Sequence, residues 1–227
     1  MNQVRINGGR LWLVGVALVF APLAQATAAS VERRDFSLRV DNKPAGDYQM
    51  VITAQGDGTT VVTCQARVEV KKLVGIYKYT YSYRGTETWQ GHRLIRLESS
   101  TNDDGTRFTV NAVADGNWLR VKVNDQERLS RPDVWTTSYW RLPEARFRNG
   151  AVPLLDADTA QPIDGQMRLV GTEALSIGGQ TQNCAHYHVS GKRIEVDVWY
   201  DAQERMVRQE SVEQGHRTVF ELTGLRR

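Results

Sequence analysis

The sequence of 227 residues has few of the residues that usually reveal an activity: two cysteines, four histidines and six prolines. It lacks a paired Cys-x-x-Cys, a phosphate-binding glycine loop and a Gly-x-Ser-x-Gly nucleophile motif, so we predict no catalytic residue and no cofactor. Basic and acidic residues nearly balance, at 29 and 26, which argues against a nucleic-acid-binding protein. A hydrophobic content of 41% excludes both a multi-span membrane protein and a disordered chain. The composition is that of a globular domain.

Residues 1–26 have the organisation of a secretory signal peptide. Arg5 and Arg10 provide the positive start, residues 11–20 form an apolar run, and Ala24-Gln25-Ala26 fits a cleavage site. The run of ten residues is shorter than the ~20 that cross a bilayer, so we expect no membrane span after cleavage. The chain is therefore predicted to be periplasmic or secreted.

Cleavage would leave residues 27–227, which we interpret as a single β-rich domain. Cys64 and Cys184 would then enter an oxidising compartment, where a disulfide would contribute roughly 2–4 kcal/mol. Alternation places Cys64 on the apolar face of its segment, whereas Cys184 alternates with the apolar Tyr187 and should point outward. Opposite faces argue against a disulfide, but whether the two cysteines pair stays open at this point.

From residue 35 onward, short segments of alternating apolar and polar residues are separated by turn residues such as Asp104-Gly105 and Asp115-Gly116. Residues 42–46, with Pro and Gly, are expected to form a loop. Short connections force neighbouring strands to be antiparallel. We predict an all-β fold, a strongly curved antiparallel meander of about twelve strands that forms a half-barrel or barrel. The expected strands lie near 36–40, 48–52, 59–70, 76–89, 93–101, 106–114, 117–124, 166–176, 182–190, 193–200, 205–213 and 216–224.

Residues 129–165 interrupt this pattern. They contain four prolines and no alternation, and residues 136–138 could cap a short helix that starts near Tyr139. Because long loops in compact domains are usually functional or disordered, we expect an irregular or short-helical lid across the mouth of the sheet. The alternative is a surface segment whose aromatic side chains only attach it. Asp156 and Asp158, within this segment, lack the further acidic ligands of a calcium-binding loop.

The segment 76–90 carries the most distinctive pattern, because tyrosines repeat along it with a period of two. Residues at this spacing share one face of a strand, where an ordinary core strand would carry Val, Ile or Leu. A row of phenols suits the wall of an amphipathic cavity, and the alternative is a packed core without a ligand. The predicted ligand-binding residues are Tyr77, Tyr79, Tyr81, Tyr83, Glu87 and Trp89 on this face, with Trp135, Tyr139 and Trp140 from the lid.

Glu87 is the acidic member of this face. It is either a polar anchor for the head group of a ligand or one partner of a salt bridge with Arg96 or Arg120, because an unpaired buried carboxylate is unfavourable.

His186 and His188 share one face of another predicted strand, and such a pair can contribute two ligands to zinc. No second cluster supplies the remaining ligands, so we predict no metal site.

With these segments identified, the sequence resembles an uncharacterised family of exported bacterial β-rich proteins, a domain of unknown function. The resemblance covers nearly the whole chain after the signal peptide and implies architecture and compartment only. In layout, it is also similar to the periplasmic lipoprotein carriers of the LolA/LolB type, in which a curved sheet holds acyl chains under a lid. The segments that carry the family resemblance are Asn42-Lys43-Pro44-Ala45-Gly46, Tyr83-Arg84-Gly85-Thr86-Glu87-Thr88-Trp89, Thr137-Ser138-Tyr139-Trp140 and Asp197-Val198-Trp199-Tyr200-Asp201.

Our leading hypothesis is an exported, non-enzymatic protein that holds a hydrophobic or lipid-like ligand in a curved β-sheet. A second hypothesis is a structural module of the cell envelope that binds a protein partner. A third is an unrecognised hydrolase or transferase that acts on envelope material.

Overall fold

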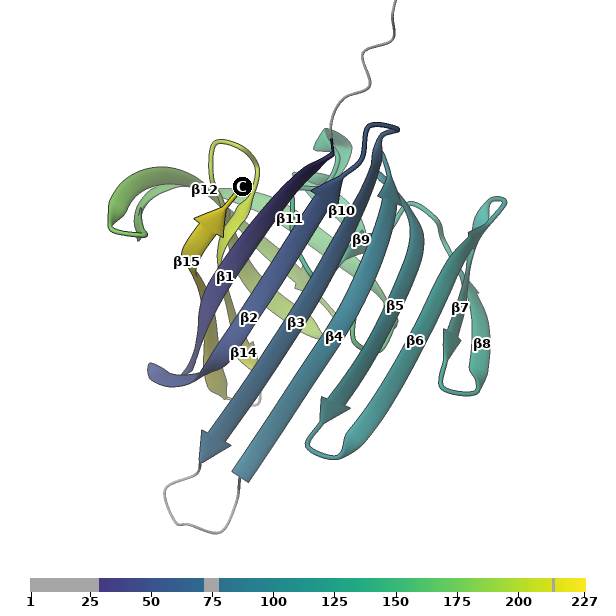
Figure 1. Cartoon of the computed structure of the whole chain (residues 1–227), viewed down its shortest axis with the longest axis horizontal. Helices are drawn as coiled ribbons and strands as arrows, with labels where there is room; N and C mark the ends of the chain where they lie inside the picture. The colour runs from purple at the N-terminus through teal and green to yellow at the C-terminus, as the bar shows by residue number, and fades with distance from the viewer. Residues whose placement is uncertain (1–28, 72–77, 214) are drawn as a thin grey trace, which may run out of the picture.

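The computed structural model describes residues 29–71, 78–213 and 215–227. The predicted signal peptide, residues 1–26, and one member of the tyrosine row, Tyr77, lie outside the described residues. Within the described ranges the chain forms fifteen β-strands and one short 3-10 helix, and all the strands belong to a single sheet (Figure 1).

The first meander contains eight strands: β1 (Ser30–Val40), β2 (Lys43–Ala54), β3 (Thr59–Lys71), β4 (Lys78–Gln90), β5 (Arg93–Asp103), β6 (Thr106–Asp115), β7 (Trp118–Val123) and β8 (Gln126–Ser130). The second meander contains the 3-10 helix η1 (Ala145–Phe147) and seven strands: β9 (Trp135–Thr136), β10 (Gly150–Leu155), β11 (Pro162–Ile177), β12 (Gln180–Gly191), β13 (Ile194–Tyr200), β14 (Met206–Glu213) and β15 (His216–Arg226).

The first and last strands join these two meanders in the middle of the sheet. The strand order is β8-β7-β6-β5-β4-β3-β2-β1-β15-β14-β13-β12-β11-β10-β9, and β1 pairs with both β2 and β15. All neighbouring strands are antiparallel except β9 and β10, which are parallel. The predicted all-β, curved antiparallel meander is therefore confirmed, with fifteen strands in place of about twelve.

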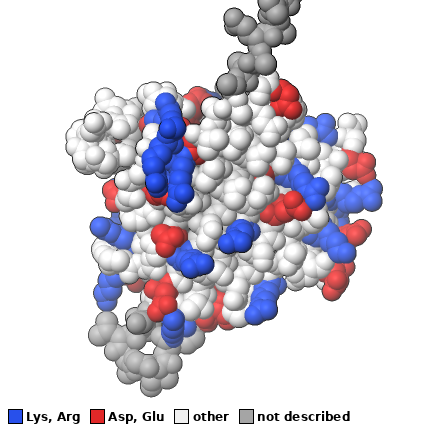
Figure 2. Space-filling model, viewed as in Figure 1, with Lys and Arg blue, Asp and Glu red and all other residues white. Residues whose placement is uncertain are grey.

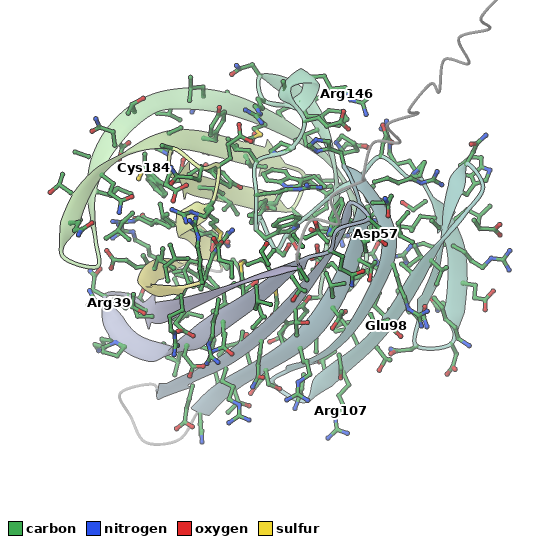
Figure 3. All side chains as sticks on the ribbon, turned by 45° about the horizontal axis from the view of Figure 1, so that its top comes forward. Arg39, Asp57, Glu98, Arg107, Arg146 and Cys184 are labelled. Atoms are coloured by element: carbon green, nitrogen blue, oxygen red, sulfur yellow. The ribbon has the colours of Figure 1, made fainter. Side chains whose placement is uncertain are left out.

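The sheet curls strongly, as long twisted sheets do. Strands β10–β14 lie behind β1–β6 in Figure 1, so the two meanders face each other. Figure 3 shows side chains filling much of the space between them, whereas Arg107 projects away from the interior. The strand order begins at β8 and ends at β9, and these two edge strands are not paired with each other, so the curled sheet is open.

The β1–β2 connection is tighter than the predicted loop over residues 42–46. The turn contains only Asp41 and Asn42, whose φ angles of 49° and 64° are those that aspartate and asparagine tolerate better than most residues. Residues 43–46 instead begin β2. A Cβ atom at Gly46 would lie 1.8 Å from the carbonyl oxygen of Arg67, so glycine permits the close approach of β2 and β3.

The interrupting segment differs from the prediction in two ways. No helix begins near Tyr139, because this residue has a φ of 49° and Thr136 belongs to β9. Three strands, β8, β9 and β10, lie at the start of this segment or within it, where none was expected. β9 has only two residues, and Val152–Leu155 of β10 is buried on both faces, so neither strand shows alternation.

The convex face of β1–β7 carries basic and acidic side chains interspersed with uncharged ones (Figure 2). Some form ion pairs along one strand, such as Arg96 with Glu98 at 2.8 Å and Arg33 with Asp35 at 3.2 Å. Exposed pairs of this kind contribute little stability, so this face mainly keeps the outside of the sheet hydrated.

Both cysteines are free and buried. Cys64 lies on the inner face of β3, and burial raises the pKa of its thiol. Cys184 is also fully buried, although alternation places it on the face of β12 that carries His186 and His188. The disulfide that alternation argued against is therefore not formed.

Candidate functional site

The two meanders enclose a cavity of about 1740 Å³. Its wall contains residues of β1–β6, β11 and β13–β15, so neither meander forms the cavity alone. Apolar side chains that border it include Leu38, Val68, Val70, Ile163, Val196 and Phe220. The interior of the sheet is thus a partly apolar hollow as well as a packed core.

The mouth of the cavity lies at the end of the sheet where three hairpin turns meet. Residues of the β1–β2 and β12–β13 connections border the cavity, as do the strand ends Glu213 of β14 and His216 of β15, and Lys43, Lys192 and Arg193 are exposed. The rim residues with charged or titratable side chains are Asp41, Lys43, Lys192, Arg193 and His216.

The tyrosine row of β4 borders the cavity through Tyr79, Tyr81 and Tyr83. Alternation along β4 turns these side chains inward, while Ser82 and Arg84 are exposed on the opposite face. The hydroxyl of Tyr79 donates a hydrogen bond to Asp103 Oδ1 at 2.7 Å. The wall is therefore aromatic and also carries polar groups.

Tyr83 lies over a glycine of its own strand. A Cβ atom at Gly85 would come within 2.0 Å of the Tyr83 hydroxyl oxygen, so only glycine leaves room for this ring position. The hydroxyl is buried and has no hydrogen-bond partner among the described residues. Burial raises the pKa of this phenol, so it stays protonated at neutral pH.

The predicted aromatic residues divide between the cavity and its closed end. Tyr139 borders the cavity, whereas Trp89, Trp135 and Trp140 do not. The rings of Trp89 and Trp140 are 6.3 Å apart, and the Arg141 guanidinium lies 4.4 Å from the Trp140 ring centre. Trp89, Trp135, Trp140 and Arg141 form what we call the plug, at the end of the sheet opposite the mouth. We had expected the aromatic residues of segment 129–165 to form a lid across the mouth instead.

Glu87 belongs to this plug. It is fully buried, and its Oε2 accepts hydrogen bonds from Trp89 Nε1 at 2.8 Å and from Thr136 Oγ1 at 2.9 Å. Burial raises the pKa of its carboxyl group. The salt bridge considered from the sequence is absent, because Arg96 pairs with Glu98 and Arg120 with Asp115. Glu87 thus connects β4 to β9, away from the cavity wall.

The turn between β10 and β11, residues 156–161, enters the interior and contacts the first meander. Ser99 Oγ donates to the Ala157 carbonyl at 2.7 Å, and an Arg128 guanidinium nitrogen donates to the Ala160 carbonyl at 2.6 Å. Asp156 Oδ1 accepts the backbone N–H of Asp158 at 2.8 Å, which fixes the turn. This turn bridges the open edges of the curled sheet.

The same turn places a carboxyl group against the tyrosine row. The Tyr81 hydroxyl donates to Asp158 Oδ2 at 2.6 Å. Burial, with the neighbouring carboxylate of Asp156, raises the pKa of Asp158 to about 7. This contact was not predicted, because nothing in the local sequence pattern around the two aspartates indicates that their turn meets β4.

The two histidines of β12 lie on the face opposite to Tyr187. His186 is 2.6 Å from Glu173 and 2.7 Å from Asp197, and its ring stacks on Trp199 with centres 4.2 Å apart. Among the residues that the structure describes, no group of three His, Cys, Asp or Glu side chains is arranged to hold a metal ion.

The sequence of this chain matches a family of unknown function. The family is DUF6134, a domain of unknown function, and the match spans residues 36–223. The chain belongs to this family. The matched region contains every described residue of the cavity wall, so the cavity is part of the family's domain.

The fold is similar to that of a Brucella abortus protein, whose crystal structure is described as a beta-barrel-like protein of domain of unknown function DUF1849. The two structures superpose with a TM-score of 0.62 at 9% sequence identity, over 86% of this chain and 96% of the other. At this identity the likeness shows the fold alone. No curated protein matches the sequence. In the described part of the chain, no helix is long and apolar enough to cross a membrane.

Proposed function

We propose that this protein is exported to the periplasm and binds a hydrophobic or amphipathic, lipid-like ligand inside the curled sheet, without catalysing a reaction. The observation that supports this most strongly is the cavity of about 1740 Å³ bordered by Tyr79, Tyr81 and Tyr83. Ordinary small-molecule sites have volumes of roughly 300–1,000 Å³, so this cavity is large enough for a chain-like molecule.

The wall is also suited to an amphipathic ligand. Aliphatic side chains such as Leu38, Val68 and Val196 can cover an apolar tail, and tyrosine hydroxyls and carboxyl groups offer hydrogen bonds to a polar head. The plug around Trp140 closes one end, so a ligand would enter through the mouth with its tail directed inward.

A neutral fluorescent probe, N-phenyl-1-naphthylamine, tests whether the cavity binds apolar molecules. We expect saturable binding to the protein, with one site per chain. Val68→Trp places a large side chain in the cavity and should weaken probe binding at least about tenfold, because the added ring occupies the hollow.

The matched control is Thr63→Trp on the exposed face of the same strand, which should bind the probe like the wild type. Thermal unfolding shows whether both variants are folded. Absence of saturable binding, or equal loss in both variants, would overturn the proposal. Mass spectrometry of solvent extracts from protein purified from its native envelope would identify a resident lipid.

Export is tested by fractionation and intact mass. We expect the protein in the periplasmic fraction with a mass that corresponds to a chain starting at Thr27. A mass that retains residues 1–26 would contradict this part of the proposal.

A further inference from the structure

Four carboxylates surround the tyrosine row near the cavity mouth. Two of them accept hydrogen bonds from Tyr79 and Tyr81, at 2.7 and 2.6 Å. They come from the end of β5, the β10–β11 turn and the end of β14, so the curling of the sheet alone brings them together. We name as the acidic cluster Asp103, Asp156, Asp158 and Glu213.

The members of the acidic cluster are close enough to affect each other's ionisation. Burial raises the pKa of Glu213, and the carboxylates of Asp156 and Asp103 raise it further. Burial also raises the pKa of Asp158, and the carboxylates of Asp156, Glu213 and Asp103 raise it further. Bringing like charges together in this way is unfavourable for an empty cavity.

The described basic side chains of the cavity wall do not neutralise this cluster. Among the residues that the structure describes, the wall contains seven Asp or Glu and three Lys or Arg, and these three are exposed at the rim. At the mouth, Asp41 pairs with His216 and Glu69 with Lys78. Among the described residues, no ion pair involves a member of the acidic cluster.

Two unpartnered hydroxyl groups belong to the same cavity wall as the cluster. Tyr83 and Tyr139 both border the cavity, and their buried hydroxyls have no hydrogen-bond partner within the described residues. Burial raises the pKa of each phenol, and nearby groups raise it further: Cys64 and Glu87 before Asp158 for Tyr83, and Asp156 with Glu213 for Tyr139. A buried hydroxyl without a partner is unfavourable, so a ligand that supplies one would stabilise it.

The cation that this arrangement fits is organic. No three acidic or histidine side chains in the described ranges converge tightly enough for a metal ion. Aromatic rings such as Tyr79 and Tyr81 attract ammonium groups, which carry their charge over a larger volume than a metal ion. Apolar side chains of the same wall, such as Val68 opposite Tyr81 in the register of β3 and β4, then accommodate a hydrocarbon chain.

We propose that the cavity selects amphiphiles with a positively charged ammonium head group, which lies against the acidic cluster and the tyrosine row while the tail lies along the apolar part of the wall. This inference rests on the proposed lipid-binding function and names the chemistry of its ligand.

The test compares three probes with the same twelve-carbon tail: dodecyltrimethylammonium, dodecyl sulfate and dodecyl maltoside. Each is titrated below its micelle concentration against the protein loaded with N-phenyl-1-naphthylamine. We expect the cation to displace the probe at a concentration at least about tenfold lower than either competitor, and added salt to reduce this difference.

A double variant, Asp103→Asn with Glu213→Gln, removes two charges at the mouth while keeping the shape of both side chains. Its affinity for dodecyltrimethylammonium should fall about tenfold, with unchanged binding of the neutral maltoside. The control is Asp125→Asn with Glu127→Gln, which changes the net charge equally but lies outside the cavity wall. This control should match the wild type.

The outcomes separate the two proposals. If the neutral probe binds but the cation shows no preference in the wild type, the ammonium inference is wrong and the binding function stands. If neither the neutral probe nor any of the three amphiphiles binds, both are wrong. Because head-group preference and its salt dependence are measured on the unmodified protein, a variant that fails to fold does not affect the decision.

Discussion

At the scale of single residues, the tyrosine row shows how side-chain alternation becomes a cavity wall. Tyr79, Tyr81 and Tyr83 follow one another at every second position, and the pleat of β4 directs all three inward. The space for the last ring depends on the absence of a side chain at Gly85. Glycine inside a strand is usually unfavourable, so this one has a packing reason.

We therefore expect Gly85→Ala to lower the free energy of unfolding by about 1–3 kcal/mol, because the new methyl group overlaps the Tyr83 hydroxyl. Urea denaturation measures the change. A Tyr83→Ala background should remove most of this loss, as a double-mutant cycle would show. Gly171→Ala is the control: nothing lies within 4 Å of its added Cβ, so a comparable loss there would contradict the explanation.

Asp158 makes stability depend on pH. Its pKa rises from 3.8 in the unfolded chain to about 7 in the folded protein, where Tyr81 and the rest of the acidic cluster face it. Between these values the folded state holds a proton that the unfolded state has lost, so the free energy of unfolding decreases as pH rises.

Asp158→Asn cannot ionise and still accepts the Tyr81 hydrogen bond. The free energy of unfolding of this variant minus that of the wild type should increase by about 1–3 kcal/mol from pH 5 to pH 8. Urea denaturation at the two pH values measures it, with Asp125→Asn as the exposed control. Equal pH dependence in the wild type and Asp158→Asn would show that this carboxyl group is not the cause.

At the scale of elements, the β10–β11 turn connects the second meander to the first. Its contacts with Ser99 on β5 and Arg128 on β8 are among those that hold the two meanders together in a sheet without a closing strand pair. The turn also places Asp156 and Asp158 in the cavity wall, so one segment both links the two meanders and contributes residues to the candidate site.

Ser99→Ala should lower stability by about 1–3 kcal/mol, because the buried Ala157 carbonyl loses its donor. Hydrogen exchange within residues 156–161 should accelerate in this variant. Ser100→Ala, on the exposed face of β5, is the matched control and should leave exchange in the turn unchanged. Unchanged exchange in Ser99→Ala would mean that other contacts hold the turn.

The elements also show which parts of the fold sequence patterns can predict. Hairpins such as the one around Asp104-Gly105 combine alternation with a turn that demands positive φ, so their strands were located correctly. β8 contains a single apolar residue, β9 is too short to show a period, and β10 is buried on both faces, so all three were missed. The period of two predicted correctly that the tyrosines share one face of a strand. The acidic cluster could not be predicted, because its members lie up to 110 residues apart in sequence and meet only when the sheet curls.

At the scale of the whole molecule, the two free cysteines mean that the fold is held together without covalent cross-links. Cys64 and Cys184 are both buried as thiols. Thiol titration should find two groups per chain after denaturation without reductant, and slow reaction before denaturation. Intact mass should be unchanged by reductant, and a two-dalton increase would reveal a disulfide instead.

The pairing of β1 with β15 determines when the cavity can exist. Residues near the start of the domain meet residues near its end there, as Arg33 meets Arg226, whereas nearly every other pairing is between strands adjacent in sequence. Each meander can assemble from local hairpins as the chain emerges, but this last seam must wait for the final strand. A newly made chain therefore has no complete cavity until β15 has been synthesised, and under the proposed function the ligand would enter only after folding.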